Sequence, residues 1–333
     1  MDTETTRDKA FSSMRSVLVY GKKALAITLP ANWVKVRGIR PGDKLEVIVT
    51  PDGNLVVRTT HKTAGDKYYE VMIDGGDSFP LVLRSVISAY IAGFNKILVK
   101  NKNKKLLNDV KRVMESLVLG LNVLDEGEDN IIFYSVVDLS SIGFWNAFSQ
   151  EHKVASKMLR LTLYGMRTRN RDILTTVIDM DTVVDKLYLY ISRMITSTLT
   201  GNTPLSDLEI SSPALLPILY LSAKSIERIA DHSVIIASNS IDLIDNNKEI
   251  SNDILGRLEE AIKFYNKVVA NLISKSHNKS IDYLLDDSFD IIVENVSEAR
   301  ILDSIRRIIR YSIDLSEAMI QSQMIKKITV GQA

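Results

Sequence analysis

The sequence predicts a multidomain α+β protein, with a small β-rich head, a small α/β sandwich and an all-α body of two tandem three-helix bundles. Three observations lead to this fold class. Residues 14–60 alternate short β-type runs with glycine and proline turns. Residues 67–138 follow the order βαβαββ, and the chain from residue 143 onward shows helical periodicity with an internal repeat. A chain of 333 residues has room for two or three such domains.

Composition excludes several classes of protein. The chain has no cysteine, which rules out disulfides and thiolate chemistry. Its N-terminus, MDTETTRDKA, lacks the apolar core of a signal peptide, and no stretch approaches 18 uninterrupted apolar residues. We therefore expect a cytoplasmic protein without membrane insertion.

The first elements belong to a head at residues 14–60, which follows a polar segment, 1–13, expected to be a flexible arm. SVLVYGKKALAITLP predicts two short strands, ANWVKV a short helix and RGIRPGD a turn. KLEVIVT and NLVVRT flank Pro51-Asp52-Gly53 and predict a hairpin. About 45 residues are close to the smallest self-sustaining core, so we expect the head to form a homodimer.

Charge is unevenly distributed along the chain. Residues 14–60 hold eight lysines and arginines against three acids, a net charge of +5, whereas residues 1–13 carry −1 and the rest of the chain −3. A basic head on an acidic body is typical of a nucleic-acid-binding module joined to a sensor. Ordinary surface charge explains the same numbers equally well.

The head resembles the SpoVT/AbrB family of swapped-hairpin DNA-binding domains, through the basic residues before its ITLP strand, the short helix, the GIRPGD turn and the closing hairpin. The resemblance implies an intertwined dimer that binds double-stranded DNA, although some relatives serve mainly in protein contacts. The DNA-binding residues it implies are Arg15, Lys22, Lys23, Lys35 and Arg37. The family often has arginine where this chain has Lys22 and Lys23. Because lysine reads guanine less well than bidentate arginine, we expect contacts to the DNA backbone more than to bases.

The second unit, residues 67–138, predicts a small α/β sandwich. Strands are expected at YYEVMI, KILVK, LNVLDE and NIIFYSVV, and helices at FPLVLRSVISAYIAGF and KKLLNDVKRVMESLV. The loop DGGDSFP could present backbone N–H groups to an anion. It has neither a phosphate-loop lysine nor a GxGxxG pattern, which favours a plain turn.

The third part, residues 143–325, predicts six helices in two triplets. They are expected near 145–169, 171–199, 213–240, 252–275, 279–295 and 298–325. SIERIADHS at 225–233 and SIRRIIRYS at 304–312 agree at five of nine positions with an offset of 79, which indicates a duplicated unit.

Four carboxylates in the first triplet are arranged symmetrically. Asp181 and Asp185 lie four residues apart on one helix, and Glu227 and Asp231 lie four apart on the next. Asp185 and Glu227 are symmetric about residue 206 in the connecting loop, and so are Asp181 and Asp231. An antiparallel hairpin therefore brings all four side chains to about the same level. Converging carboxylates require a cation or protons. In the alternative reading, Lys224 and Arg228 pair with the acids on a solvated face of little energetic weight.

The stretch IERIADHSVIIA resembles the helix signature of the PhoU family of phosphate-uptake regulators, whose twin three-helix bundles carry acidic-x-x-x-Asp motifs. The resemblance covers roughly residues 143–325 and implies a cofactor: iron, zinc or another divalent metal. The metal ligands it implies are Asp181, Asp185, Glu227 and Asp231. His232 points away from Asp231 on the helix and is expected at the surface.

The second triplet replaces acids with arginines. Arg306 and Arg310 stand where the first triplet has Glu227 and Asp231. The helix before them carries acids four apart: Asp282, Asp286, Asp290 and Glu294. The same symmetry argument, about residue 298, pairs Asp290 with Arg306 and Asp286 with Arg310. We expect these ion pairs to replace a second metal site.

Together these features favour a phosphate-uptake regulator, because the fusion of an AbrB-like head to a PhoU-like body is most familiar from archaeal proteins of that kind. We expect a dimeric DNA-binding transcriptional regulator whose body senses phosphate status or docks on the phosphate transport machinery. The alternative is a non-DNA-binding dimeric adaptor that contacts a phosphate transporter ATPase or another signalling partner. The sequence has no Glu-x-x-His motif, nucleophile–base pair or nucleotide-binding loop, so we expect no enzymatic activity.

Overall fold

The structure is a computed structural model of the chain. It describes residues 14–21, 23–49, 53–59, 70–74, 78–136, 139, 142–274 and 295–330. The expected arm at residues 1–13 lies outside these ranges. The chain divides into two compact units, Met1–Lys67 and Tyr68–Ala333.

The head contains two hairpins and one short helix, as predicted. Its elements are β1 (Leu18–Tyr20), β2 (Ala24–Ala26), α1 (Ala31–Arg37), β3 (Leu45–Val49) and β4 (Leu55–Thr59). β1 pairs with β2 and β3 with β4, both antiparallel. Gly38 ends α1 with φ 63°, a left-handed conformation that glycine adopts without the steric penalty of a side chain.

The head buries none of its described residues in the single chain. Large apolar side chains are instead exposed on its strands and helix, among them Val19, Leu25, Val36, Val49 and Leu55. A folded module of this size requires an apolar core, so one copy of the head is incomplete.

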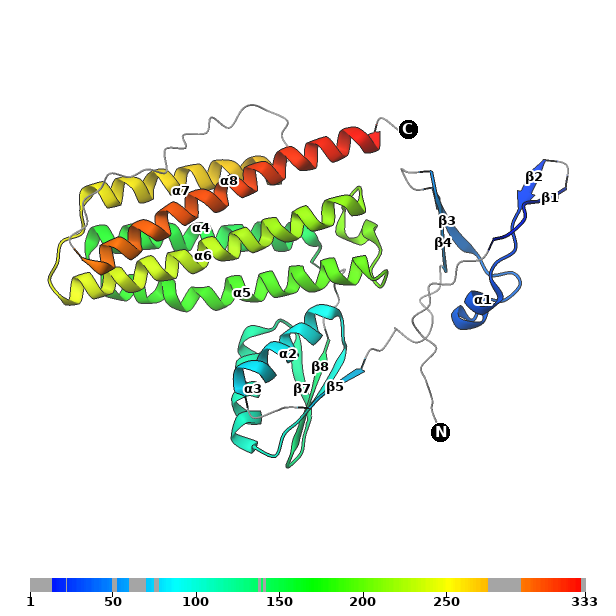
Figure 1. Cartoon of the computed structure of the whole chain (residues 1–333), viewed down its shortest axis with the longest axis horizontal. Coiled ribbons are helices and arrows are strands. Elements are labelled where there is room, and N and C mark those ends of the chain that lie inside the picture. The colour runs from blue at the N-terminus through cyan, green and yellow to red at the C-terminus, as the bar shows by residue number, and fades with distance from the viewer. Residues whose placement is uncertain are drawn as a thin grey trace. The chain divides into compact units, whose positions relative to one another are not determined.

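The α/β part has one four-stranded sheet covered by two helices (Figure 1). Its elements are β5 (Glu70–Asp74), α2 (Phe79–Ala92), β6 (Lys96–Lys100), α3 (Lys104–Leu117), β7 (Leu121–Glu126) and β8 (Asn130–Ser135). The strand order is β5-β6-β8-β7, with β5 parallel to β6 and the other pairs antiparallel. The α2 crossover makes the parallel pair possible.

One face of this sheet forms the core of the α/β part. Ile97 lies opposite Phe133 and Val99 opposite Ile131 across β6 and β8, and all four side chains are buried. They pack with the buried residues of α2 and α3 in a single cluster. Asn103 begins α3 because its side chain accepts a hydrogen bond from the Leu106 amide at 3.1 Å.

Five long helices form the body of the second unit in the ranges that the structure describes. They are α4 (Phe144–Thr168), α5 (Arg171–Leu199), α6 (Leu216–Asp245), α7 (Asn252–Ile273) and α8 (Val296–Val330). α5 and α6 are joined by a loop with two short 3-10 turns, η1 (Leu205–Leu208) and η2 (Pro213–Leu215). Five of the six predicted helices are thus present at close to the predicted bounds. The sixth, predicted at 279–295, lies almost wholly outside the described residues.

The helices of the body share one apolar core. Small buried residues allow close approach at several crossings: Ser233 of α6, for example, lies 2.8 Å from Thr162 of α4, oxygen to oxygen. Between α4 and α5 the turn is tight, with Gly165 directly against Leu174. Within the described ranges, no helix combines the length and apolarity needed to cross a bilayer.

α5 joins the α/β part to the helical body. Leu189 of α5 belongs to the core of the α/β part, and Tyr188 packs against both cores. Arg193, buried at 4% exposure, donates hydrogen bonds to the carbonyl oxygens of Tyr90, Gly93 and Phe94 at the end of α2. A cation at the C-terminus of a helix is stabilised by the helix dipole, so Arg193 caps α2 from the neighbouring domain.

Candidate functional site

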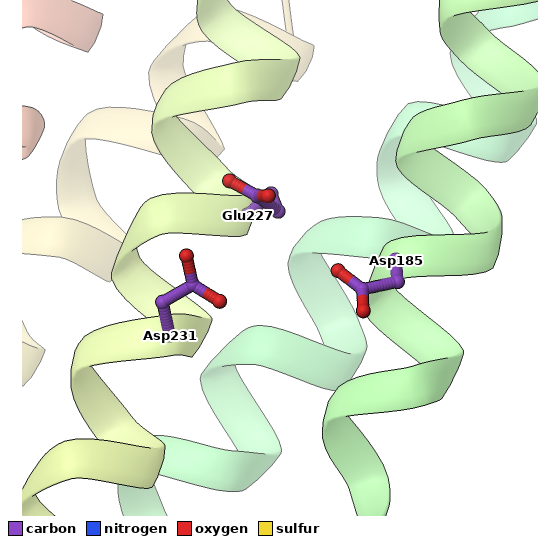
Figure 2. A group of neighbouring side chains, drawn as sticks. All are labelled: Asp185, Glu227 and Asp231. Carbon is purple, nitrogen blue, oxygen red and sulfur yellow. The ribbon is translucent and has the colours of Figure 1, made fainter. Parts of the chain in front are cut away.

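The antiparallel hairpin of α5 and α6 brings three predicted ligands together. One carboxylate oxygen from each of Asp185, Glu227 and Asp231 lies within 4.8 Å of the other two. Figure 2 shows Asp185 on one helix facing Glu227 and Asp231 on the other. The four-residue spacing places Glu227 and Asp231 on the same face of α6, directed toward α5.

Asp181 lies outside this group of three. Its Oδ1 is nevertheless buried without a hydrogen-bond partner. Burial, followed by the charge of Glu227, raises the pKa of Asp181, and the charge of Asp181 in turn raises the pKa values of Asp185 and Asp231. It therefore acts on the site electrostatically, one helical turn from Asp185.

Crowding of acids in a partly buried place changes their titration. Burial is the largest cause, and it raises the pKa of Asp185 to about 6 and that of Asp231 to about 7. Like charge adds to burial in both cases, since Glu227 and Asp181 act on each of them. Both aspartates therefore keep their protons to a higher pH than free aspartate does, and a bound cation would favour their ionised forms.

The alternative reading, a solvated ion-paired face, holds for one of its two pairs. Lys224 bonds Glu227, with 2.5 Å between Nζ and Oε1. Arg228 makes no ion pair with Asp231 within the described helices; its guanidinium lies over the Tyr311 ring, 5.4 Å from the centroid. Glu227 is also mostly buried, with its Oε2 unpartnered, unlike an acid on an open face.

Glu151 on α4 is an acid of this region that the predictions missed. It is fully buried, and neither carboxylate oxygen has a hydrogen-bond partner. Burial, reinforced by the charge of Glu227, raises its pKa well above the usual value. The signal was present in the sequence, because Phe144, Ala147, Phe148 and Ala155 put Glu151 on the apolar stripe of its helix.

The donor set fits a cation. All three grouped ligands offer carboxylate oxygens, which suit hard or borderline divalent ions. Separations of up to 4.8 Å between oxygens can be spanned by one ion with bonds of about 2.0–2.6 Å. The unpartnered Oε2 of Glu227 and Oδ1 of Asp181 lack the positive charge that such an ion would supply.

The other predicted site residues are placed as follows. In the head, Arg15 precedes β1, Lys23 lies in the β1–β2 turn, and Lys35 and Arg37 lie in the last turn of α1. All are exposed except Arg37, which is partly buried, and Lys22 lies outside the described residues. The last turn of a helix favours cations by itself, so Lys35 and Arg37 also have a structural role.

The predicted ion pairs of the second triplet stay a prediction. Asp282, Asp286, Asp290 and Glu294 lie outside the described residues. Their expected partners are on α8, where Arg306 is partly buried and Arg310 exposed. His232, expected at the surface, is half-buried and stacks on Tyr311, with 5.8 Å between ring centroids. The reason is that α8 packs along α6, a neighbour that helix geometry alone does not reveal.

Comparison with known proteins matches two segments of the chain. Residues 148–240 match the model of the PhoU domain, and this segment contains Glu151 and all four predicted metal ligands. Residues 21–64 match the model described as antidote-toxin recognition MazE, bacterial antitoxin. No curated protein and no solved structure matches the chain. The chain thus carries a PhoU domain behind a MazE/AbrB-like N-terminal domain.

Proposed function

We propose that the protein is a regulator of phosphate uptake that binds DNA as a dimer through its head. Its helical body senses phosphate status or docks on the phosphate transport machinery. The observation that carries this proposal is the presence in one chain of a MazE/AbrB-like head and a PhoU domain. The first supplies a fold suited to DNA, and the second a fold associated with control of phosphate transport.

The exposed apolar surface of the head supports self-association. Its strands and α1 leave Val19, Val36 and Val49 at 78%, 81% and 70% exposure. A second copy of the same head, interleaved through the hairpins, would bury these side chains and complete a core.

Such a dimer would present two sets of basic side chains to DNA. Arg15, Lys23 and Lys35 are exposed, and the two lysines are point charges, which favour phosphate contacts over base reading. Binding of this kind is salt-dependent, because each neutralised phosphate releases counterions.

The carboxylates of α5 and α6 would hold a divalent cation. Asp185, Glu227 and Asp231 would ligate it, with Asp181 beside them. A bound ion would neutralise the acids and tie α5 to α6, giving the body a structural state that depends on the ion. Iron, zinc and manganese are all compatible with an oxygen donor set of this size.

The second candidate function is a dimeric adaptor. The matched head family is described by toxin recognition, which is a protein contact, and this favours a head that binds proteins instead of DNA. The body would then dock on a phosphate transporter ATPase or another signalling partner.

Fluorescence anisotropy with duplex DNA from a phosphate-transport promoter tests the first function. We expect binding that weakens by roughly 10³-fold between 50 and 200 mM salt. Lys23→Ala should reduce the salt slope by about 2, because a dimer loses two phosphate contacts. Lys105→Ala on α3, outside the head, is the matched control and should leave the slope unchanged.

Sequencing of crosslinked DNA at high and low phosphate tests the same function in cells. Enrichment at phosphate-transport genes that changes with phosphate supports the regulator. If neither assay detects DNA while the protein co-purifies with a transporter component, the adaptor function replaces it.

A further inference from the structure

Lys224 lies one helical turn before Glu227 on α6 and is held from two sides. Its Nζ is 2.5 Å from Glu227 Oε1, and 4.6 Å from the centroid of the Tyr188 ring on α5. The Lys224 side chain is 30% exposed, whereas that of Glu227 is only 11% exposed. The ammonium group therefore lies at the edge of the cluster formed by Asp185, Glu227 and Asp231. It contacts an acid on α6 and an aromatic ring face on α5.

The charge of Lys224 reaches beyond its bonded partner. It opposes the effect of burial on Asp185, Asp231 and Glu151, lowering the pKa of each. Among the residues that the structure describes, it is the one cation that acts on these three carboxyl groups. Lys186, next to Asp185 in sequence, forms no ion pair with these acids in the part of the chain that the structure describes, unlike Lys224 with Glu227.

The two oxygens of Glu227 are divided between two environments. Oε1 is bonded to Lys224, while Oε2 is buried and has no partner. One oxygen is thus already neutralised, and the other remains available to an ion between α5 and α6.

We propose that Lys224 is the resident counter-ion of the metal-free site and that a divalent cation binds in competition with its positive charge. The inference rests on the cation site of the proposed function. Lys224 lowers the affinity of the site, because its charge repels the incoming ion and stabilises the empty state. The site can then empty as well as fill, which a permanent structural metal centre does not need.

Isothermal titration of the full-length protein with Mn²⁺ at one fixed pH tests the competition. Lys224→Met keeps the length of the side chain and removes its charge. We expect this variant to bind Mn²⁺ about tenfold more tightly, after allowance for solvent screening of a partly exposed charge. Lys186→Met is the matched control and should bind as the unaltered chain does.

Thermal unfolding in the presence of a chelator tests the counter-ion role without metal. Lys224→Met should lower the unfolding midpoint by about 2–4 °C, because the acids lose their neighbouring cation. Adding Asp185→Asn to that variant should restore most of the loss, since the uncompensated charge is then removed.

The outcomes distinguish the competition between Lys224 and the metal from the existence of the cation site. If Lys224→Met binds Mn²⁺ equally or more weakly, the competition is overturned, and Lys224 instead positions Glu227 as a ligand. If the unaltered chain binds neither Mn²⁺, Zn²⁺ nor Fe²⁺, the cation site of the proposed function fails, and the competition fails with it. The thermal unfolding experiment still decides the counter-ion role. An unfolding midpoint that Lys224→Met leaves unchanged overturns it, and a lowered midpoint that Asp185→Asn restores supports it.

Discussion

Burial and three neighbouring acids raise the pKa of Asp231 to about 7, above the value of about 6 for Asp185. In the unfolded chain an aspartate titrates near 3.9. The folded chain therefore holds the proton more tightly. Protonated Asp231 stabilises the fold fully below about pH 4, and this contribution is lost as the pH rises through 7.

The metal-free protein should consequently lose this contribution to its stability between about pH 4 and pH 7. Asp231→Asn should lessen this loss and raise the free energy of unfolding at pH 8 by about 1–2 kcal/mol, because an amide needs no counter-charge. Chemical denaturation with a chelator present measures both quantities.

The control for this prediction is Asp179→Asn, an exposed acid on α5. It should leave the pH dependence as it is. A protein with Asp231→Asn that still loses stability as steeply as the unaltered chain would contradict the assignment.

Sequence spacing alone predicted that three of these acids come together, as they do in the structure, whereas their role as metal ligands stays a prediction. Asp185, Glu227 and Asp231 follow from the four-residue helical repeat and from symmetry about the loop, which depend only on local geometry. Asp181 follows the same rule but lies outside the group, because the helices cross and level positions do not remain equidistant. Glu151 comes from a third helix, and no spacing rule connects α4 to the α5–α6 hairpin.

At the scale of elements, α5 serves two neighbours at once. Its first half carries Asp181 and Asp185, and its second half carries Leu189 and Arg193, which contact the α/β part. The helices and strands themselves follow the hydrophobic periodicity of the sequence closely. The docking of α2 against α5 does not, because it depends on which apolar surfaces meet after the elements form.

Removing the Arg193 guanidinium should weaken this docking. Arg193→Met leaves the carbonyl oxygens of Tyr90, Gly93 and Phe94 without their buried donor. We expect a loss of about 2–4 kcal/mol in the free energy of unfolding, measured by urea denaturation.

An exposed arginine on the same helix provides the comparison. Arg171 pairs with Asp245, and both side chains are half exposed or more. Arg171→Met should cost less than about 1 kcal/mol. Equal losses for the two variants would show that Arg193 does not secure the junction.

At the scale of the whole molecule, the head differs from the second unit in that none of its described residues is buried in a core. The sequence indicated this difference, because 45 residues with short strands supply little apolar surface that can be buried within one copy. The union of the α/β part and the helical body in one compact unit was not indicated, since each part has its own complete periodicity.

The full chain should therefore form a dimer that depends on the head. Sedimentation should give roughly twice the 37.3 kDa mass of one chain. Leu18→Asp together with Val47→Asp places charges on both exposed hairpins and should shift the protein toward the monomer.

Leu81→Asp tests whether any exposed apolar residue would have the same effect. Leu81 is exposed on α2, outside the head. Its replacement should leave the dimer intact. A dimer that survives the double change in the head would place self-association in the second unit instead.

The sharing of α5 also has a mechanical consequence. Asp185 and Arg193 are eight residues apart on one continuous helix, about 12 Å along its axis. A continuous helix moves as a stiff rod, so a rotation at one end is transmitted to the other. Any rotation that follows a change of charge at Asp185 reaches the end of α2 through Arg193, and a fluorescent label on α2 would read the occupancy of the carboxylates at a distance.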